Sequence, residues 1–152
     1  MGCALLFRSQ TLVAMLRALI VDDEADARNN LRLMIEESCP GVEVVGQAGS
    51  AAEARAFIER EPVQALFLDV KMPGEDGFSL LRSLNGRELG VVFTTAYDQY
   101  ALQAFKENAI DYLEKPIDVD QLKRAVGKLT KLAGAELLAD QRHNAIAALM
   151  HD

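Results

Sequence analysis

Short apolar runs alternate with amphipathic helical patterns along most of this chain, and that alternation limits the fold more than any other feature. Each run is nearly continuous in apolar residues and leads into a segment with helical spacing, as is typical of buried parallel strands. Five strands alternating with five helices predict an α/β fold whose parallel sheet is covered on both faces. Right-handed crossovers favour a doubly wound five-stranded parallel sheet of order 2-1-3-4-5. The expected strands are residues 17–23, 42–48, 65–69, 90–95 and 109–113.

Helix boundary signals between the runs support the same alternation. Ser50 and Glu53 form a capping box that opens the second helix, and Pro40 with its neighbours stops the first. Asp98 and Asp118 are expected N-caps of the fourth and fifth helices. The third helix is expected over residues 77–85. The inward-facing positions expected in the other helices are, in the first, Leu31, Met34, Ile35 and Ser38; in the fourth, Ala101, Leu102, Phe105 and Ala109; and in the fifth, Val119, Leu122, Val126 and Leu129.

Composition narrows the class of protein. A chain of 152 residues suits one domain with a proper core. A net charge of -7 and a pI near 4.9 argue against non-specific binding to nucleic acid or to anionic membranes. Cys3 and Cys39 show no metal or redox spacing, so free thiols in a reducing cytosol are expected. His143 and His151 lack further ligands nearby, which disfavours a metal role.

The ends of the chain fall outside the alternating pattern. Residues 1–14 form an N-terminal extension. Its apolar residues are too interrupted for the core of a signal peptide, and the segment is too short to span a membrane. The sequence from Met15 onward reads like a natural N-terminus. The expected domain covers residues 15–132. Residues 133–152 are moderately helical, interrupted by Gly134, and are expected to be a helical extension, a linker toward an absent output domain or a dimer contact.

Polar residues gather where the expected strands end. Asp22 and Asp23 end the first strand, Asp69 the third, and Thr94 and Thr95 the fourth, while the fifth leads into Lys115-Pro116. In doubly wound sheets ligands bind at this rim. Three close carboxylates repel one another unless a cation intervenes, and oxygen ligands alone suit Mg²⁺. A carboxylate beside Mg²⁺ and a lysine can attack phosphorus to form an aspartyl-phosphate.

Three other interpretations compete with that chemistry. Each terminal Asp taken alone is more often a helix cap than a ligand, but the whole set at matching strand ends favours a site. An aspartate-nucleophile phosphatase would carry a second Asp two residues after the nucleophile, where this chain has Lys71. A phosphorylation-independent interaction module would be favoured by an incomplete acidic site, and this one is complete.

Four stretches, "ALIVDDE", "LFLDVKMPGEDG", "VVFTTAYDQYALQAF" and "AIDYLEKPID", resemble the receiver domain of bacterial two-component response regulators. The resemblance covers roughly residues 16–132 and implies a flavodoxin-like receiver fold. The segment "FTTAYDQYALQAFKENAIDYLEKPI" is similar to regulators with a LytTR-type (LytR/AlgR-like) DNA-binding output domain. The implied protein is a phosphoacceptor that assists its own phosphotransfer and dephosphorylation, not an enzyme.

The resemblance also implies a role for each matching residue. Asp69 would be the phosphoacceptor, with Thr95 and Lys115 contacting the phosphoryl group. Before phosphorylation, Lys115 would pair with Asp69. The implied Mg²⁺ ligands are Asp23 directly, Asp22 through water, Asp69 and the backbone carbonyl of Lys71. Structural roles fall to Pro73 and Gly74 in a turn, to Gly77 at the entry to the third helix, and to Pro116 after a cis bond.

Signalling would follow from a switch pair, in which Thr95 moves to the phosphate and Tyr112 rotates inward. Tyr112 is equally compatible with an ordinary half-buried strand aromatic. The implied partners are a sensor histidine kinase and a second copy of the chain on phosphorylation, with DNA reached only through an output domain absent here. A cytoplasmic location without membrane contact is expected. A stand-alone receiver acting by protein contact is the alternative.

Overall fold

A computed structural model describes residues 15–84, 87–96 and 100–150, with only the backbone described for residues 101, 102, 105 and 135–150. The strands are β1 (Leu16–Val21), β2 (Val42–Ala48), β3 (Ala65–Asp69), β4 (Gly90–Thr95) and β5 (Asp111–Glu114). The helices are α2 (Ala25–Ser38), α3 (Ala51–Arg60), α4 (Gly77–Ser83), α5 (Ala101–Lys106) and α6 (Val119–Met150). Asp98, expected to cap the helix that is α5, lies outside the described residues, as do residues 1–14.

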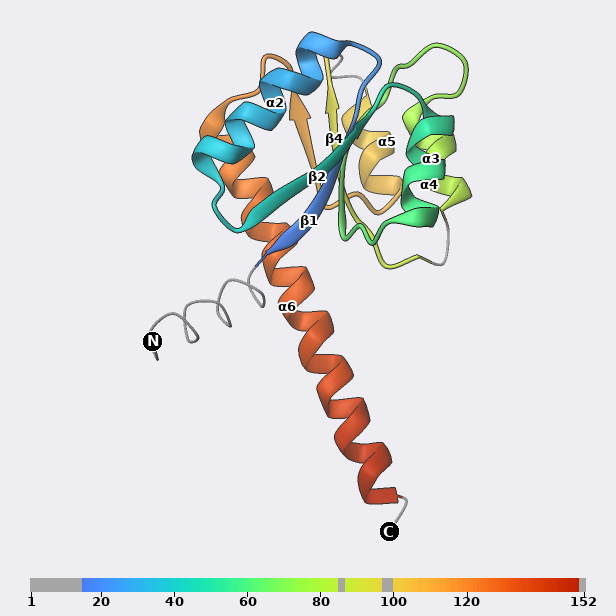
Figure 1. Ribbon diagram of the computed structural model, residues 1–152, viewed down its shortest axis with the longest axis vertical. Coiled ribbons are helices and arrows are strands. Elements are labelled where there is room, and N and C mark those ends of the chain that lie inside the picture. Colours follow the sequence, from blue (N-terminus) through green and yellow to red (C-terminus); the bar gives the residue numbers. More distant parts are fainter. Residues whose placement is uncertain (1–14, 85–86, 97–99, 151–152) are drawn as a thin grey trace.

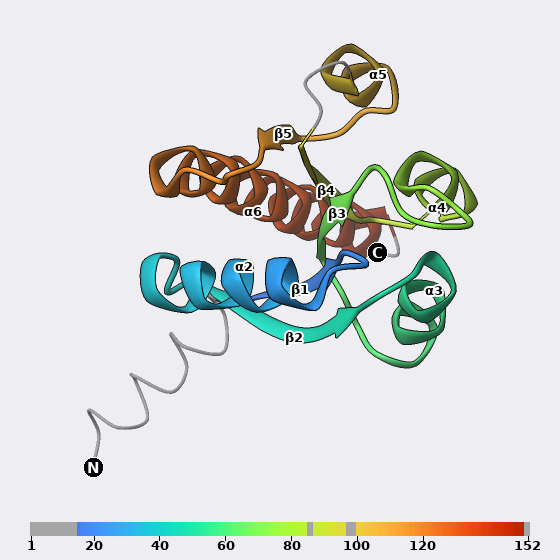
Figure 2. The same ribbon diagram turned by 90° about the horizontal axis from the view of Figure 1, so that it is seen from above.

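The sheet confirms the predicted architecture. Its order is β2-β1-β3-β4-β5 and every pairing is parallel. Helices α2 and α6 cover one face, and α3, α4 and α5 cover the other (Figures 1 and 2). Alternate residues of each strand therefore enter different cores: Leu66 and Leu68 of β3 pack toward α3 and α4, whereas Phe67 packs toward α2 and α6.

Helix caps form largely where the sequence predicts them. The Glu53 backbone N–H donates to Ser50 Oγ (3.1 Å), and Gly49 N–H donates to the Glu53 carboxylate (2.8 Å). The reciprocal bond of this capping box thus starts one residue earlier than in the usual form. Gln121 N–H donates to the Asp118 carboxylate over 3.1 Å at the start of α6.

Several boundaries differ from the sequence-based expectations. Strand β1 ends at Val21, so Asp22 and Asp23 follow it instead of forming its last two residues. Strand β5 begins at Asp111 rather than at residue 109, because Ala109 N–H still bonds the Ala104 carbonyl and Asn108 adopts φ 62° at the end of α5. Helix α4 ends at Ser83, where Leu84 N–H turns back to the Leu81 carbonyl.

The inward stripe of α6 is also shifted. Val119 is exposed, since it is the first helical residue and precedes the contact with the sheet, and Ala125 is fully buried instead. Leu122 and Leu129 face the core as expected, and Val126 is half-buried.

Helix α6 continues without a break across Gly134 to Met150, and its second half runs well beyond the sheet (Figure 1). No end of a helix therefore marks the boundary expected at residue 132. Cys39 is a buried free thiol, as predicted. Within the described part of the chain, no helix is both long and apolar enough to cross a bilayer.

Candidate functional site

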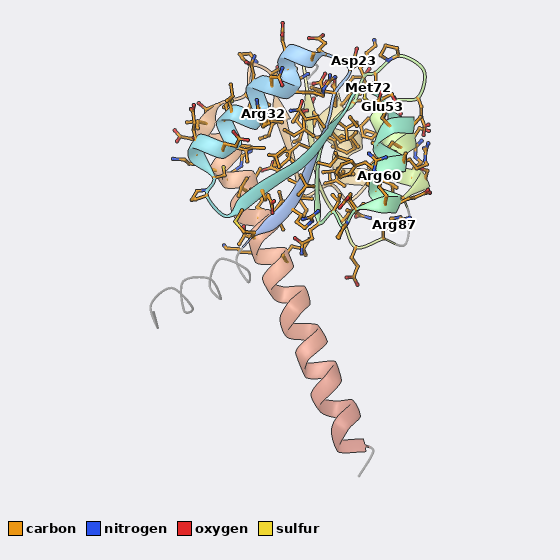
Figure 3. All side chains as sticks on the ribbon, in the orientation of Figure 1. Asp23, Arg32, Glu53, Arg60, Met72 and Arg87 are labelled. Atoms are coloured by element: carbon orange, nitrogen blue, oxygen red, sulfur yellow. The ribbon has the colours of Figure 1, made fainter. Side chains whose placement is uncertain are left out.

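The carboxyl ends of β1 and β3 bring three aspartates together. Val21 pairs with Leu68 across the sheet, so the next residues, Asp22 just after β1 and Asp69 at the end of β3, emerge at the same edge. Both are buried, 3% and 6% exposed, whereas Asp23 is exposed at the rim. One oxygen from each of the three carboxylates lies within 4.8 Å of the others. Figure 3 places Asp23 near Met72 at this end of the molecule.

Asp22 is held on all sides. Its Oδ1 accepts the N–H of Glu24 (2.9 Å), and its Oδ2 accepts a hydrogen bond from Lys115 Nζ (2.6 Å). Its backbone is fixed as well, because its N–H donates to the Ala48 carbonyl (3.0 Å) and its carbonyl accepts Arg28 Nη1 (2.7 Å). This carboxylate has little freedom to move.

Lys115 enters the same cluster from the end of β5. Its backbone N–H donates to the Thr95 carbonyl over 2.7 Å, which anchors it beside β4. The Lys115-Pro116 bond is cis, as the sequence resemblance implies. The side chain reaches both buried acids, with Nζ 2.6 Å from Asp22 and 3.5 Å from Asp69. The expected pairing with Asp69 is therefore the longer of two contacts, and Asp22 is the closer partner.

Burial and neighbouring charges shift the pKa values of Asp69 and Lys115. Burial raises the pKa of Asp69 to about 6, with the nearby Asp22 charge adding to the rise, while Lys115 and the Lys71 backbone N–H oppose it. Burial works to lower the pKa of Lys115, but the hydrogen bond to Asp22 and the charge of Asp69 outweigh it and the net direction is upward. A fully ionised pair of acids here has more negative charge than one lysine neutralises.

The chain after β3 folds back over the site in a short loop, residues 70–76. Gly77 N–H bonds the Val70 carbonyl (2.8 Å) and closes the loop. A Cβ on Gly77 would collide with the backbone carbonyl oxygen of Asp69, so only glycine permits this close approach. Gly74 has φ +81°, the left-handed conformation that glycine adopts without strain, and it follows Pro73 in the expected turn. The Lys71 side chain is exposed.

Thr95 and Tyr112 lie on the same face of the sheet. Thr95 is fully buried at the end of β4, two residues after Phe93, whose register partner on β5 is Tyr112. Tyr112 is half-buried and packs against the core that α3, α4 and α5 cover. Thr94 alternates to the other face and pairs in register with Asp69.

The sequence analysis missed the residues that brace the site from outside. Arg28 holds the Asp22 carbonyl, and Arg55 of α3 contacts the loop after β3 through Glu75. Asp76 caps α4 by accepting the Ser79 N–H (2.8 Å). Only Asp76 had a sequence signal, an acid just before a helix. The arginine contacts depend on how separate elements pack.

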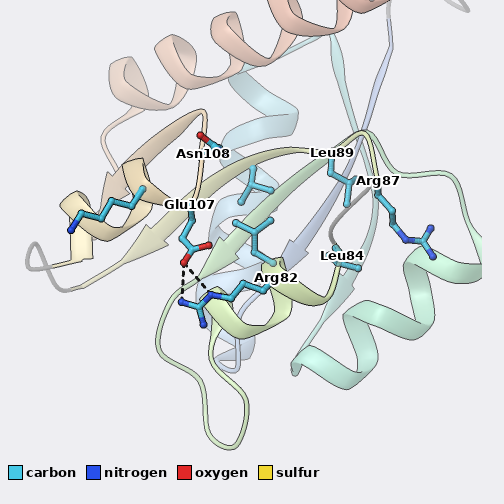
Figure 4. Close-up of a pocket in the computed structure, with 9 residues that line it drawn as sticks. Arg82, Leu84, Arg87, Leu89, Glu107 and Asn108 are labelled. Atoms are coloured by element: carbon cyan, nitrogen blue, oxygen red, sulfur yellow. Dashed lines mark hydrogen bonds and ion pairs between the residues drawn. The ribbon is translucent and has the colours of Figure 1, made fainter.

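A cavity of about 390 Å³ lies between α4 and α5, away from these carboxylates. Figure 4 shows the Arg82–Glu107 ion pair at its edge, with Leu84 and Leu89 nearby. Arg87, which also lines it, lies at the opposite end of the part that holds the sheet from Asp23 (Figure 3). The cluster of three aspartates and Lys115 and this cavity are therefore separate features.

Residues 18–127 match the family model described as the response regulator receiver domain. The match covers more than half of the chain, which therefore belongs to this family and is a receiver domain of the kind found in response regulators.

Individual curated relatives of this chain are also named as regulatory proteins. An "uncharacterized response regulatory protein" of Vibrio cholerae serotype O1 is 46% identical over 118 residues, covering 77% of this chain and 49% of the relative. The "transcriptional regulatory protein BtsR" of Escherichia coli (strain K12) is 40% identical over 116 residues, covering 76% and 48%. The chain thus spans about half the length of the curated relatives it matches.

Solved structures match the same fold. The REC domain of AraT, a response regulator from Geobacillus stearothermophilus, has a TM-score of 0.72 at 32% identity, covering 80% of this chain and 98% of that one. The response regulatory domain of protein mrkE from Klebsiella pneumoniae has a TM-score of 0.70 at 29% identity, covering 77% and 97%.

Proposed function

We propose that Asp69 accepts a phosphoryl group and that the chain acts as a phosphorylation-controlled switch rather than as a conventional enzyme. One observation carries the proposal: three carboxylates with oxygens within 4.8 Å of one another share the rim with the ammonium group of Lys115. Such an arrangement is electrostatically costly unless a divalent cation joins it. Its position at the switch in strand order is where doubly wound sheets bind ligands.

The donor set fits Mg²⁺. The cluster of Asp22, Asp23 and Asp69 offers only oxygen atoms, without thiol or imidazole, which suits a hard cation. We infer that these three residues and the Lys71 backbone carbonyl would hold the ion. When bound, it would supply positive charge that offsets the phosphoryl oxygens.

The proposed reaction uses this chain's residues as follows. An Asp69 carboxylate oxygen attacks the phosphorus of a phosphohistidine or of acetyl phosphate. The new O–P bond forms as the donor's bond to phosphorus breaks, and the displaced imidazole or acetate leaves. Lys115, already 3.5 Å from Asp69, would pair with the added negative charge. The Thr95 hydroxyl would donate a hydrogen bond to a phosphoryl oxygen.

The same residues would report the modification. Movement of Thr95 toward the phosphate would leave space that the Tyr112 ring can enter, and the face formed by α5, β5 and α6 would change with it. We propose that this face forms a homodimer. Asp111 is already paired within the chain, with Arg124 (3.1 Å) and Lys128 (3.3 Å), and Glu107 is paired with Arg82 (2.8 Å). The exposed Lys106, Asp120 and Lys123 are then the candidates for pairing across the dimer.

A protein phosphodonor needs a docking surface beside Asp69, and a groove of about 510 Å³ next to Lys115 provides one. Residues of α2 and the segment after β5 line it, with Leu33 45% exposed at its edge. We infer that a sensor histidine kinase docks here. Leu33→Glu is then expected to slow transfer from a phosphorylated kinase that serves the wild type, and to leave uptake from acetyl phosphate unchanged. Leu132→Glu, at a leucine of similar exposure (40%) outside the groove, is the control.

The output of the switch is inferred from the relatives. The BtsR relative is named a transcriptional regulatory protein, and we propose that this receiver controls transcription through a LytTR-type DNA-binding domain beyond the chain described. DNA contact would then belong to that domain. A cytoplasmic location follows from the proposed kinase partner.

Intact-mass spectrometry after acetyl phosphate treatment tests the proposal. Wild type and Asp26→Ala, which changes an exposed acid of α2, are expected to gain one phosphoryl group only when Mg²⁺ is present. Asp69→Ala is expected to gain none. Size-exclusion chromatography of the same samples tests dimer formation. A wild type that takes up no phosphoryl group would instead favour an interaction module that works without phosphorylation.

A further inference from the structure

The loop of residues 70–76 carries the Lys71 carbonyl past the carboxylate cluster, and most of its restraints are local. Its ends are joined by the Gly77–Val70 hydrogen bond, Met72 is buried at 6% exposure, and Asp76 caps α4. None of these three contacts ties the loop to α3.

Arg55 supplies such a tie. From α3, its Nη2 contacts Glu75 Oε2 at 2.6 Å, within the loop. The same guanidinium donates from Nε (3.2 Å) and from Nη2 (2.9 Å) to Ser83 Oγ, at the end of α4. One side chain thus joins α3, the loop and α4.

The acceptors of Arg55 are themselves fixed. Glu75 Oε2 also accepts a hydrogen bond from Ser79 Oγ (3.2 Å), and Ser83 Oγ donates to the Leu80 carbonyl (2.7 Å). The Arg55 hydrogen bond lowers the pKa of the Glu75 carboxyl, because it stabilises the charged form of that group. Arg55, Glu75 and Ser83 are therefore connected in one hydrogen-bond network, and the loop joins this network through the Glu75 side chain.

We propose that Arg55 is a positioning residue: it holds the loop of residues 70–76 in the conformation that presents the Lys71 carbonyl to the metal, and so sets metal affinity and the lifetime of the phosphorylated state. This inference rests on the proposed function of Asp69. A loop that is ordered beforehand loses less conformational entropy when its ligand binds. Because Arg55 and Glu75 are each 33% exposed, the effect is that of a partly screened ion pair.

A purely structural role would look different. If Arg55 only fastened α3 to α4, then Ser83→Ala would reproduce Arg55→Ala, and changes would appear across both helices. If Arg55 positions the loop, the change is confined to the loop, and Ser83→Ala, which keeps the Glu75 pair, leaves metal affinity close to that of the wild type.

Hydrogen exchange of the metal-free protein, followed by mass spectrometry, measures the loop directly. Arg55→Ala is expected to speed exchange of residues 70–76, to weaken Mg²⁺ binding by about two- to fivefold in calorimetry, and to change the decay rate of the phosphorylated form. Arg55→Lys, which keeps a cation within reach of Glu75, is expected to recover part of each loss. Arg82→Ala is the matched control, because it removes an arginine–glutamate pair that joins α4 to the residue after α5 (Figure 4).

Unchanged loop exchange and unchanged Mg²⁺ affinity in Arg55→Ala would overturn the inference, as would equal effects from Arg82→Ala. Failure of the proposed function is separable from this result. If the wild type takes up no phosphoryl group, Asp69 loses its proposed role, yet loop exchange in the metal-free chain still decides whether Arg55 orders the loop.

Discussion

Lys115 Nζ lies 2.6 Å from Asp22 Oδ2 and 3.5 Å from Asp69 Oδ2, so the lysine neutralises Asp22 more fully than Asp69. This asymmetry fits the raised pKa of Asp69, about 6, since burial of that carboxylate is only partly offset. In the proposed reaction, the acid that must attack phosphorus is the one that its lysine holds less tightly.

Lys115→Met is expected to destabilise the metal-free protein, because two buried acids lose their cation. Removing one partner of a buried pair costs about 3–5 kcal/mol, and the partial exposure of Lys115 reduces this to about 1–3 kcal/mol. Urea unfolding in EDTA measures the change, and added Mg²⁺ is expected to restore part of it. Lys131→Met, at an exposed position of α6, serves as the control. Equal unfolding midpoints for Lys115→Met and wild type would contradict the prediction.

Asp69→Asn is expected to stabilise the metal-free protein at neutral pH. The folded-state pKa of Asp69 is raised, so its contribution to stability is fully present below the unfolded value, near 3.8, and is lost as pH rises through about 6. A neutral amide avoids that loss and is expected to add about 2 kcal/mol at pH 7.5 and almost nothing near pH 4. Thermal unfolding in EDTA across this range measures the difference. A gain that did not depend on pH would argue against the charge as its cause.

Asp111 is expected to contribute stability with the opposite pH dependence. Burial works to raise its pKa, but the Arg124 hydrogen bond, the Tyr112 N–H and the nearby Lys128 charge outweigh it and the net direction is downward. The contribution is therefore present above the unfolded pKa and is lost as pH falls through the lower folded value. Asp111→Asn is expected to cost about 1 kcal/mol at pH 7 and to differ little from wild type in strong acid. Urea unfolding at several pH values tests this, with exposed Asp120→Asn as control.

Gly77→Ala is expected to damage both the fold and phosphoryl uptake, because its Cβ would collide with the carbonyl oxygen of Asp69, the proposed phosphoacceptor, and shift the backbone there. A loss of about 1–3 kcal/mol is expected from such overpacking. Gly127→Ala is the matched control, since nothing lies within 4 Å of its Cβ position and the substitution removes a helical glycine. That control is expected to be stabilised by about 0.5–1 kcal/mol. Denaturant unfolding and acetyl phosphate uptake are the two measurements.

Lys71→Asn is expected to change the lifetime of phosphorylated Asp69. The Lys71 side chain is exposed two residues after Asp69, the proposed phosphoacceptor, where it can lie over the site and affect the attacking water. Decay of the phosphorylated form, followed by intact mass, measures the lifetime. Lys123→Asn, at an exposed lysine of α6, is the control. An unchanged half-life in Lys71→Asn would remove this role.

Much of the fold was predictable because it depends on local patterns. Apolar runs and helical spacing predicted all five strands and their order, and the family of the chain was recognisable from residues at the strand ends. The errors lay at boundaries and faces. Strand β5 starts later because the turn at Asn108 still belongs to the end of α5, and Val119 is exposed because its helix begins outside the core.

The sequence by itself determined which chemical groups reach the rim, since residue type and strand order place Asp22, Asp69 and Lys115 there. Only the tertiary structure decided how they pair. Lys115 is 93 residues from Asp22 in the chain, and which of the two acids lies closer to its ammonium group depends on where β5 packs beside β4. The Arg55 contact with Glu75 likewise spans α3 and the loop after β3. Such distances are set by packing between elements, and a local sequence pattern carries no information about that packing.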